Sequence, residues 1–121
     1  IYSNLYSDTQ VQETEMQVIQ NLRLAREASV SSLNNAAHGV KFLSTSYVIY
    51  QGDSYAARDA GYDRIYTLDN ALKLSTSFVA DDVNFSKNIG NPNAAGTVTL
   101  THSTQGIKII GVNRLGAVDE Q

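Results

Sequence analysis

The segment DTQVQETEMQVIQNLRLAREASVSSLNN, residues 8–35, decides the fold. It contains no Gly and no Pro, and its apolar and small residues recur at three- and four-residue steps, as on one face of an α-helix. At 1.5 Å per residue this helix would be about 40 Å long, which is long for so small a chain. The predicted core-facing register is Val11, Val18, Leu22, Ala25 and Ser29, widened by Ile19, Arg26, Val30 and Leu33.

The first half of this helix carries only one thin apolar line among Gln, Glu and Thr residues. We interpret that line as too narrow to be buried by the helix's own domain alone. A helix with so narrow a seam usually continues another segment or packs against neighbours. We therefore expect part of it to contact other chains.

The rest of the chain contains strand and turn signals only. His38 and Gly39 predict the end of the helix, because Gly suits the left-handed position that commonly follows a last helical turn. In 97–101, apolar residues alternate with threonines, which predicts a strand with its apolar side inward. The expected strands are 40–50, 64–68, 72–79, 82–86, 97–101, 107–112 and 117–120.

The segment 40–50 is rich in β-branched and aromatic residues and is expected to be one central strand. Its two faces would be Val40, Phe42, Val48, Tyr50 and Leu43, Tyr47, Ile49. One long helix followed by antiparallel strands predicts the α+β class, with about six to seven strands. We expect one domain over 1–121, with the helix in 1–37 and the β part in 38–121.

The composition excludes several classes of function. The chain has 121 residues and a formal net charge of −3, which argues against nucleic-acid binding because that affinity depends on Lys and Arg. It has no Cys, and hence no disulfide, thiolate zinc site or cysteine nucleophile. No run reaches the roughly 20 apolar residues that span a bilayer. Because the sequence begins at Ile1 without a Met, we expect it to be a fragment.

Several segments resemble minor type IV pilins and the H-type minor pseudopilins of type II secretion. The resemblance covers residues 10–120 and depends on the order and spacing of these segments together. They are VIQNLRLAREAS at 18–29, GVKF at 39–42, YVIYQGDSY at 47–55, RDAGYD at 58–63, DVNFS at 82–86, GNPN at 90–93 and GTVTL at 96–100.

The resemblance implies a pilin-like fold and a structural subunit that is not an enzyme and needs no cofactor. It implies an apolar helical segment ahead of Ile1 that anchors the protein in the bacterial inner membrane before assembly. The protein would then reside in the periplasm or at the cell surface, and outside the cell as part of a filament. Its partners would be other pilin or pseudopilin subunits, at or near a filament tip.

For contact with other subunits we predict residues from the helix and from the loop 51–63. One stripe of the helix would pack on its own sheet while the opposite face meets neighbours. The predicted contact residues are Val11, Glu15, Arg26, Asp53, Tyr55 and Tyr62. The alternative function is a ligand-binding tip module for adhesion or DNA uptake, although the acidic balance argues against DNA.

Other candidate chemistry is weak. His38 is expected to be exposed or to interact with the helix dipole, and His102 lies at a strand end without the sequence context of a catalytic triad. Asp53, Asp59 and Asp63 could in principle hold Ca²⁺, but their spacing does not match an EF-hand, and pairing with a loop arginine is the simpler interpretation.

Two arginines of the helix also have expected partners. Arg23 is expected to pair with Glu27 one turn later on the same helix. Arg26 falls on the apolar seam, so it should either extend its guanidinium to solvent or pair with an acidic side chain.

Overall fold

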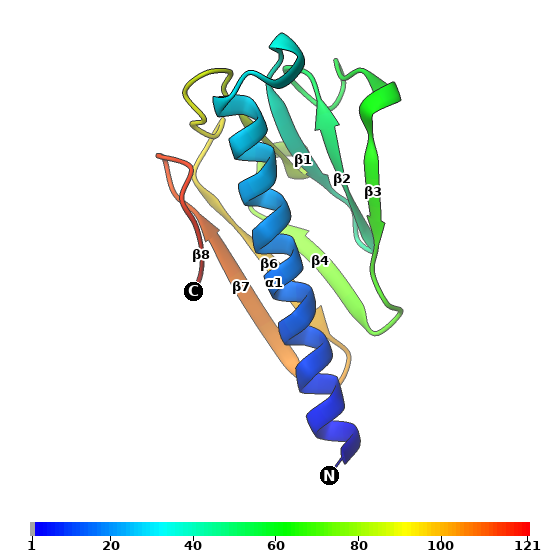
Figure 1. Ribbon diagram of the computed structural model, residues 1–121. Helices are drawn as coiled ribbons and strands as arrows, with labels where there is room; N and C mark the ends of the chain where they lie inside the picture. Colours follow the sequence, from blue (N-terminus) through cyan, green and yellow to red (C-terminus); the bar gives the residue numbers. More distant parts are fainter. Residues whose placement is uncertain (1) are drawn as a thin grey trace.

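The computed structural model describes residues 2–121, with side chains from Gln10 onward. The expectation about Ile1 and what precedes it lies outside this range. Helix α1, Tyr2–Val30, crosses in front of two antiparallel four-stranded sheets, and its first turns project beyond them (Figure 1). The predicted α+β class is therefore confirmed.

Sheet A has the order β3-β2-β1-β5 and sheet B the order β4-β6-β7-β8. The described residues thus form eight strands, slightly more than the six to seven predicted. Three short 3₁₀ helices connect them: η1 (Leu33–Asn35), η2 (Ala60–Tyr62) and η3 (Val79–Asp81). The strands are β1 (His38–Phe42), β2 (Ser46–Gln51), β3 (Arg64–Thr67), β4 (Leu72–Thr76), β5 (Asp82–Phe85), β6 (Gly96–His102), β7 (Gly106–Val112) and β8 (Val118–Glu120).

The core lies between α1 and the inner faces of both sheets. The predicted register of the helix is confirmed, because Val11, Val18, Leu22, Ala25 and Ser29 are all buried. Fully burying an aliphatic side chain contributes about 1.5–3 kcal/mol, so this stripe alone fixes the helix to the sheets. The thin apolar line is thus covered by the chain's own sheets, which corrects our interpretation that it needed a neighbour.

The segment 40–50 is a hairpin and not one strand. The chain reverses at Leu43–Ser46, where Leu43 N donates to Ser46 O at 2.8 Å. Because the turn changes the alternation, the predicted faces were wrong: Tyr47 lies on the inner face with Val40, and Tyr50 lies on the outer face. The turn contains no Gly, Pro, Asn or Asp, and its only turn-favouring residues are Ser44, Thr45 and Ser46, which give a weaker signal.

The helix ends earlier than predicted, and Gly39 lies within β1. After Val30 the chain passes through Ser32, Asn34 and Asn35, which have φ of 55°, 56° and 57°. Asn tolerates this left-handed region because its short polar side chain bonds locally. The Ser29 hydroxyl, buried at the helix end, accepts from His38 N at 2.7 Å and donates to His38 O at 3.1 Å, and so binds β1 to α1.

In β6 the predicted alternation is confirmed. Val98 and Leu100 are buried beneath the helix, while Thr97, Thr99 and Thr101 face outward. Strand β6 therefore contributes a row of threonines to the outer face of sheet B. Leu74 N of β4 donates to Ser44 O at 2.9 Å, which joins sheet B to the hairpin of sheet A.

Candidate functional site

The face of α1 opposite the core carries exposed apolar side chains. Met16 is 69% exposed and Leu24 is 56% exposed, eight residues further along the helix. Gln20 lies between them, and the charged side chains of Glu13, Arg23 and Glu27 are exposed on the same side of the helix. Large apolar side chains aligned on one face of a helix are suited to contact with another protein.

A groove of about 500 Å³ continues this apolar strip between the C-terminal part of α1 and sheet A. Its walls are mainly apolar, and Glu27 and Arg64 bring one charge of each sign to it. The lining residues are Leu24, Ala25, Glu27, Ala28, Ser31, Leu33, Asn34, His38, Ile49, Tyr50, Gln51, Tyr62 and Arg64. We call it the α1–β3 groove.

Two of the predicted contact residues, Val11 and Glu15, point into the molecule. Val11 belongs to the core, and Glu15 is only 4% exposed on the same stripe. Both therefore pack against sheet B within the described chain. Their role in subunit contact stays a prediction, but Met16 and Leu24 are better placed for it.

Glu15 lies near Glu120 of β8 and Lys108 of β7, on the inner face of sheet B. Burial raises the pKa of the Glu15 carboxyl above its ordinary value, and the carboxyl group of Glu120 raises it further. The ammonium group of Lys108 acts in the opposite direction. The core-facing stripe of the helix thus carries an acid whose pKa lies above its ordinary value.

Arg26 is half-buried, and among the described residues its guanidinium pairs with no acidic side chain, which was one of the two predicted alternatives. Its Nε donates to Gly90 O at 3.2 Å, and the side chain lies beneath Gly90 and Gly116. Both glycines have positive φ, 80° and 88°. A Cβ on Gly116 would come within 3.0 Å of Arg26 Nε and Gly90 O. Arg26 therefore fixes two loops to the end of the helix.

Arg23 does not pair with Glu27 as predicted. Its Nη2 donates to Val118 O at 2.6 Å and approaches Asp119 Oδ1 at 3.4 Å. The helix side chain thus contacts the last strand, β8, and not its own helix. A main-chain carbonyl at a sheet edge was the acceptor that the sequence pattern did not reveal.

The predicted loop residues have different surroundings. Asp53 is exposed. Tyr55 is packed, with the Arg58 guanidinium 3.9 Å from its ring centroid and the ring of Tyr50 at 5.7 Å. Tyr62 is half exposed and lines the α1–β3 groove. Of these three, Tyr62 is the one that the structure brings together with the exposed helix face.

Tyr50 anchors the loop 51–63 and was missed as a structural residue. Its ring lies across Gly39, where a Cβ would come within 3.0 Å of the ring. The hydroxyl donates to Asp82 Oδ1 at 2.5 Å and accepts from Asn84 Nδ2 at 3.1 Å. Asp82 Oδ2 also accepts from Tyr55 N at 3.1 Å. Burial raises the pKa of Tyr50, and the acceptor Asp82 raises it further.

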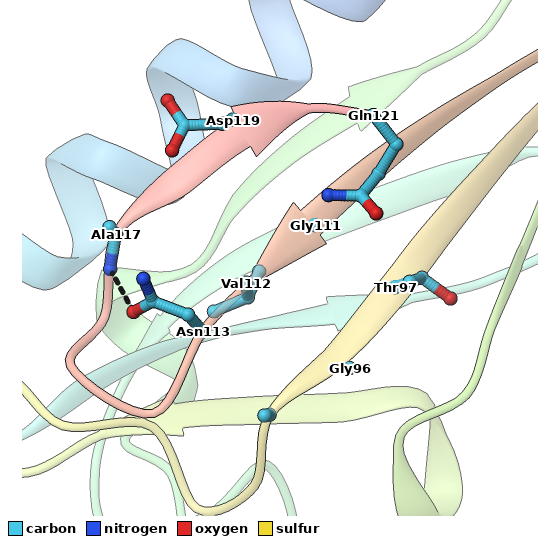
Figure 2. Close-up of a pocket in the computed structure, with 9 residues that line it drawn as sticks. Gly96, Thr97, Gly111, Val112, Asn113, Ala117, Asp119 and Gln121 are labelled. Carbon is cyan, nitrogen blue, oxygen red and sulfur yellow. Dashed lines mark hydrogen bonds between the residues drawn. The ribbon is translucent and has the colours of Figure 1, made fainter.

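A second hollow, of about 490 Å³, lies against β6, β7 and β8 (Figure 2). The Gln121 side chain extends over Gly111, and Asn113 Oδ1 accepts from Ala117 N at 3.0 Å (Figure 2). Gly96, Thr97 and Asp119 contribute to its walls. The hollow is wide open and holds no cluster of side chains arranged for chemistry.

Both histidines are buried, contrary to the predicted exposure of His38. His38 Nε2 lies 3.0 Å from Leu33 O, and His102 Nε2 lies 3.2 Å from Gln10 Oε1. Asp63 pairs with Arg58 at 3.0 Å, and Asp59 accepts from Gly61 N at 3.1 Å. Among the described residues, no three His, Asp or Glu side chains converge as a metal site would require.

No family model and no curated protein sequence matches the chain. Solved structures do share its fold. The minor pseudopilin EpsH from the Type 2 Secretion System of Vibrio cholerae aligns with a TM-score of 0.70 and 14% identity, over 93% of this chain and 96% of EpsH. The type IV minor pilin FimU of Pseudomonas aeruginosa aligns with a TM-score of 0.75 and 15% identity, over 94% of this chain and 90% of FimU.

A second crystal form of FimU gives a TM-score of 0.67 and 17% identity, over 91% of each chain. The predicted pilin-like fold is therefore confirmed over nearly the whole chain. Within the described residues, no helix is both long and apolar enough to cross a membrane.

Proposed function

We propose that this chain is a structural subunit of a pilin-type filament, a minor pilin or minor pseudopilin, and not an enzyme. The observation that carries the proposal is the outward face of α1. Met16 and Leu24 expose apolar surface there, on a helix whose opposite face is already buried by its own sheets. Such a helix, on the fold shared by a minor pilin and a minor pseudopilin, is suited to pack against helices of neighbouring subunits.

In this proposal the helix continues upstream as an apolar segment that holds the protein in the inner membrane before assembly. The subunit then enters the filament, at or near its tip, and helps to assemble it. Its partners are other pilin or pseudopilin subunits. The net charge of −3 supports protein partners over nucleic acid, because nucleic-acid affinity depends on Lys and Arg that neutralise phosphates.

The test is to place a charge on the exposed helix face and to measure incorporation into filaments. Met16→Lys and Leu24→Lys should each reduce the amount of this subunit in sheared filaments, because each places a charge where an apolar contact is proposed. Thr101→Lys, on the outer face of sheet B and so on the side away from α1, adds the same charge at an exposed position and is the control. Normal incorporation of both helix variants would refute the proposal.

A further inference from the structure

Three of the four outer strands already have a partner along their free edge. Beside β5, Ser86 N donates to Asn91 O at 2.8 Å and Asn93 N donates to Asn84 O at 2.9 Å. Beside β4, Leu74 N donates to Ser44 O at 2.9 Å. At β8, Val118 O accepts from Arg23 at 2.6 Å. These contacts cover edges that could otherwise pair with another strand.

The fourth outer strand, β3, has no such cover. Within residues 10–121, β2 supplies every hydrogen bond recorded for the main chain of residues 64–67. Alternate residues of an antiparallel strand direct N–H and C=O to the same side, so half of these groups face outward. The strand has no Pro, Gly or Lys, its one charged residue, Arg64, stands at its start, and Ile65 is 67% exposed.

The open edge adjoins the α1–β3 groove. Tyr62 and Arg64, just before and at the start of β3, belong to its wall. A strand added to β3 would direct alternate side chains toward the helix, into this groove, and the intervening ones toward the side of Ile65. An open row of main-chain donors and acceptors is matched by an extended chain, whereas the main-chain groups of a helix are already paired.

We infer that β3 and the α1–β3 groove together bind an extended strand of a neighbouring subunit, with apolar residues at alternate positions. The added strand continues sheet A under the flank of α1. This inference rests on the proposed function for the identity of the partner. It assigns β3 a contact that is separate from the packing of Met16 and Leu24.

Amide hydrogen exchange tests strand addition directly. The probes are the soluble domains of the other pilin-like proteins encoded in the same genome, each mixed singly with this chain. In the complex, the outward amides of residues 64–67 should exchange about 100-fold more slowly, because they acquire acceptors. A complex that leaves these amides unprotected would overturn the inference, and so would the absence of binding by every probe.

Variants separate this contact from the helix contact. Ile65→Lys should weaken the complex about tenfold or more, because lysine on an edge strand opposes pairing, while Ile65→Thr should retain it. Both variants should keep the wild-type melting temperature, since Ile65 is exposed. If Met16→Lys weakens assembly and Ile65→Lys does not, the filament proposal stands and strand addition is wrong. If only Ile65→Lys weakens assembly, strand addition stands without the helix contact.

Discussion

Replacing Gly116 by Ala tests whether Arg26 and two glycines form one packed unit. Gly116 has a φ of 88°, a region that costs a residue with a Cβ about 1–2 kcal/mol. The new methyl group would also come within 3.0 Å of Arg26 Nε and Gly90 O. Forcing a methyl group into filled space costs about 1–3 kcal/mol, and the loss of freedom in the unfolded chain offsets about 0.4–1 kcal/mol. We expect a net destabilisation of about 3 kcal/mol.

Gly106→Ala is a matched control. Gly106 has the same φ of 88°, but a Cβ built there meets no atom within 4 Å. The Gly106→Ala variant should therefore be destabilised only by the unfavourable backbone conformation of the new alanine. The expected loss is about 1 kcal/mol after the offset in the unfolded state. Urea unfolding of both variants, compared at constant m-value, measures the difference. Equal destabilisation by the two substitutions would refute the packing argument.

A double-mutant cycle identifies the crowded group. Arg26→Ala removes the guanidinium that lies beneath Gly116, so Gly116→Ala should cost less in that background. Residues in contact usually couple by about 0.5–3 kcal/mol. Here the double variant should be destabilised by less than the sum of the two single variants. Additive effects would mean that Arg26 does not support this loop.

Three further predictions concern single polar side chains. Tyr50→Phe removes the partner shared by Asp82 and Asn84 and should destabilise the fold by about 1–3 kcal/mol in urea unfolding; no loss would show that water replaces the hydroxyl. Glu15 has a raised pKa, so its effect on stability is most favourable below the ordinary glutamate pKa and is lost as the pH rises above it. Glu15→Gln should therefore gain stability relative to the wild type as the pH rises above the ordinary glutamate pKa, and a difference in melting temperature that stays constant with pH would contradict the assignment. Arg23→Ala removes an exposed contact to β8 and should cost less than about 1 kcal/mol.

Periodicity predicted the parts of the fold that depend on local pattern. The buried register of α1 and the alternation of β6 follow from repeats of 3.6 and 2 residues, which one sequence displays in full. The hairpin at 43–46 was missed because its turn has no Gly, Pro, Asn or Asp and only the weaker signal of serine and threonine. Its omission also reversed the faces of Tyr47 and Tyr50, since one turn changes the parity of every later residue.

The candidate site was less predictable because its contacts join distant segments. Arg26 binds a carbonyl 64 positions away, and Arg23 binds one 95 positions away. Main-chain acceptors leave no side-chain signature, so charge pairing within the helix was the natural but wrong expectation for Arg23. The glycines at 90 and 116 were visible in the sequence, but only the fold shows that both accommodate one arginine.

The structure changes the reason for expecting neighbours. The thin apolar line of the helix suggested a missing partner, yet Val11 and Val18 are buried in the chain's own core. Among residues 10–121, the exposed apolar side chains include Met16 and Leu24 on the opposite face of the helix and Ile65 at the edge of sheet A. Because the core-facing seam is occupied, a neighbouring subunit can be added without displacing any described packing. The same reasoning makes Glu15 a determinant of the chain's own stability, so a substitution there should change the melting temperature before it changes assembly.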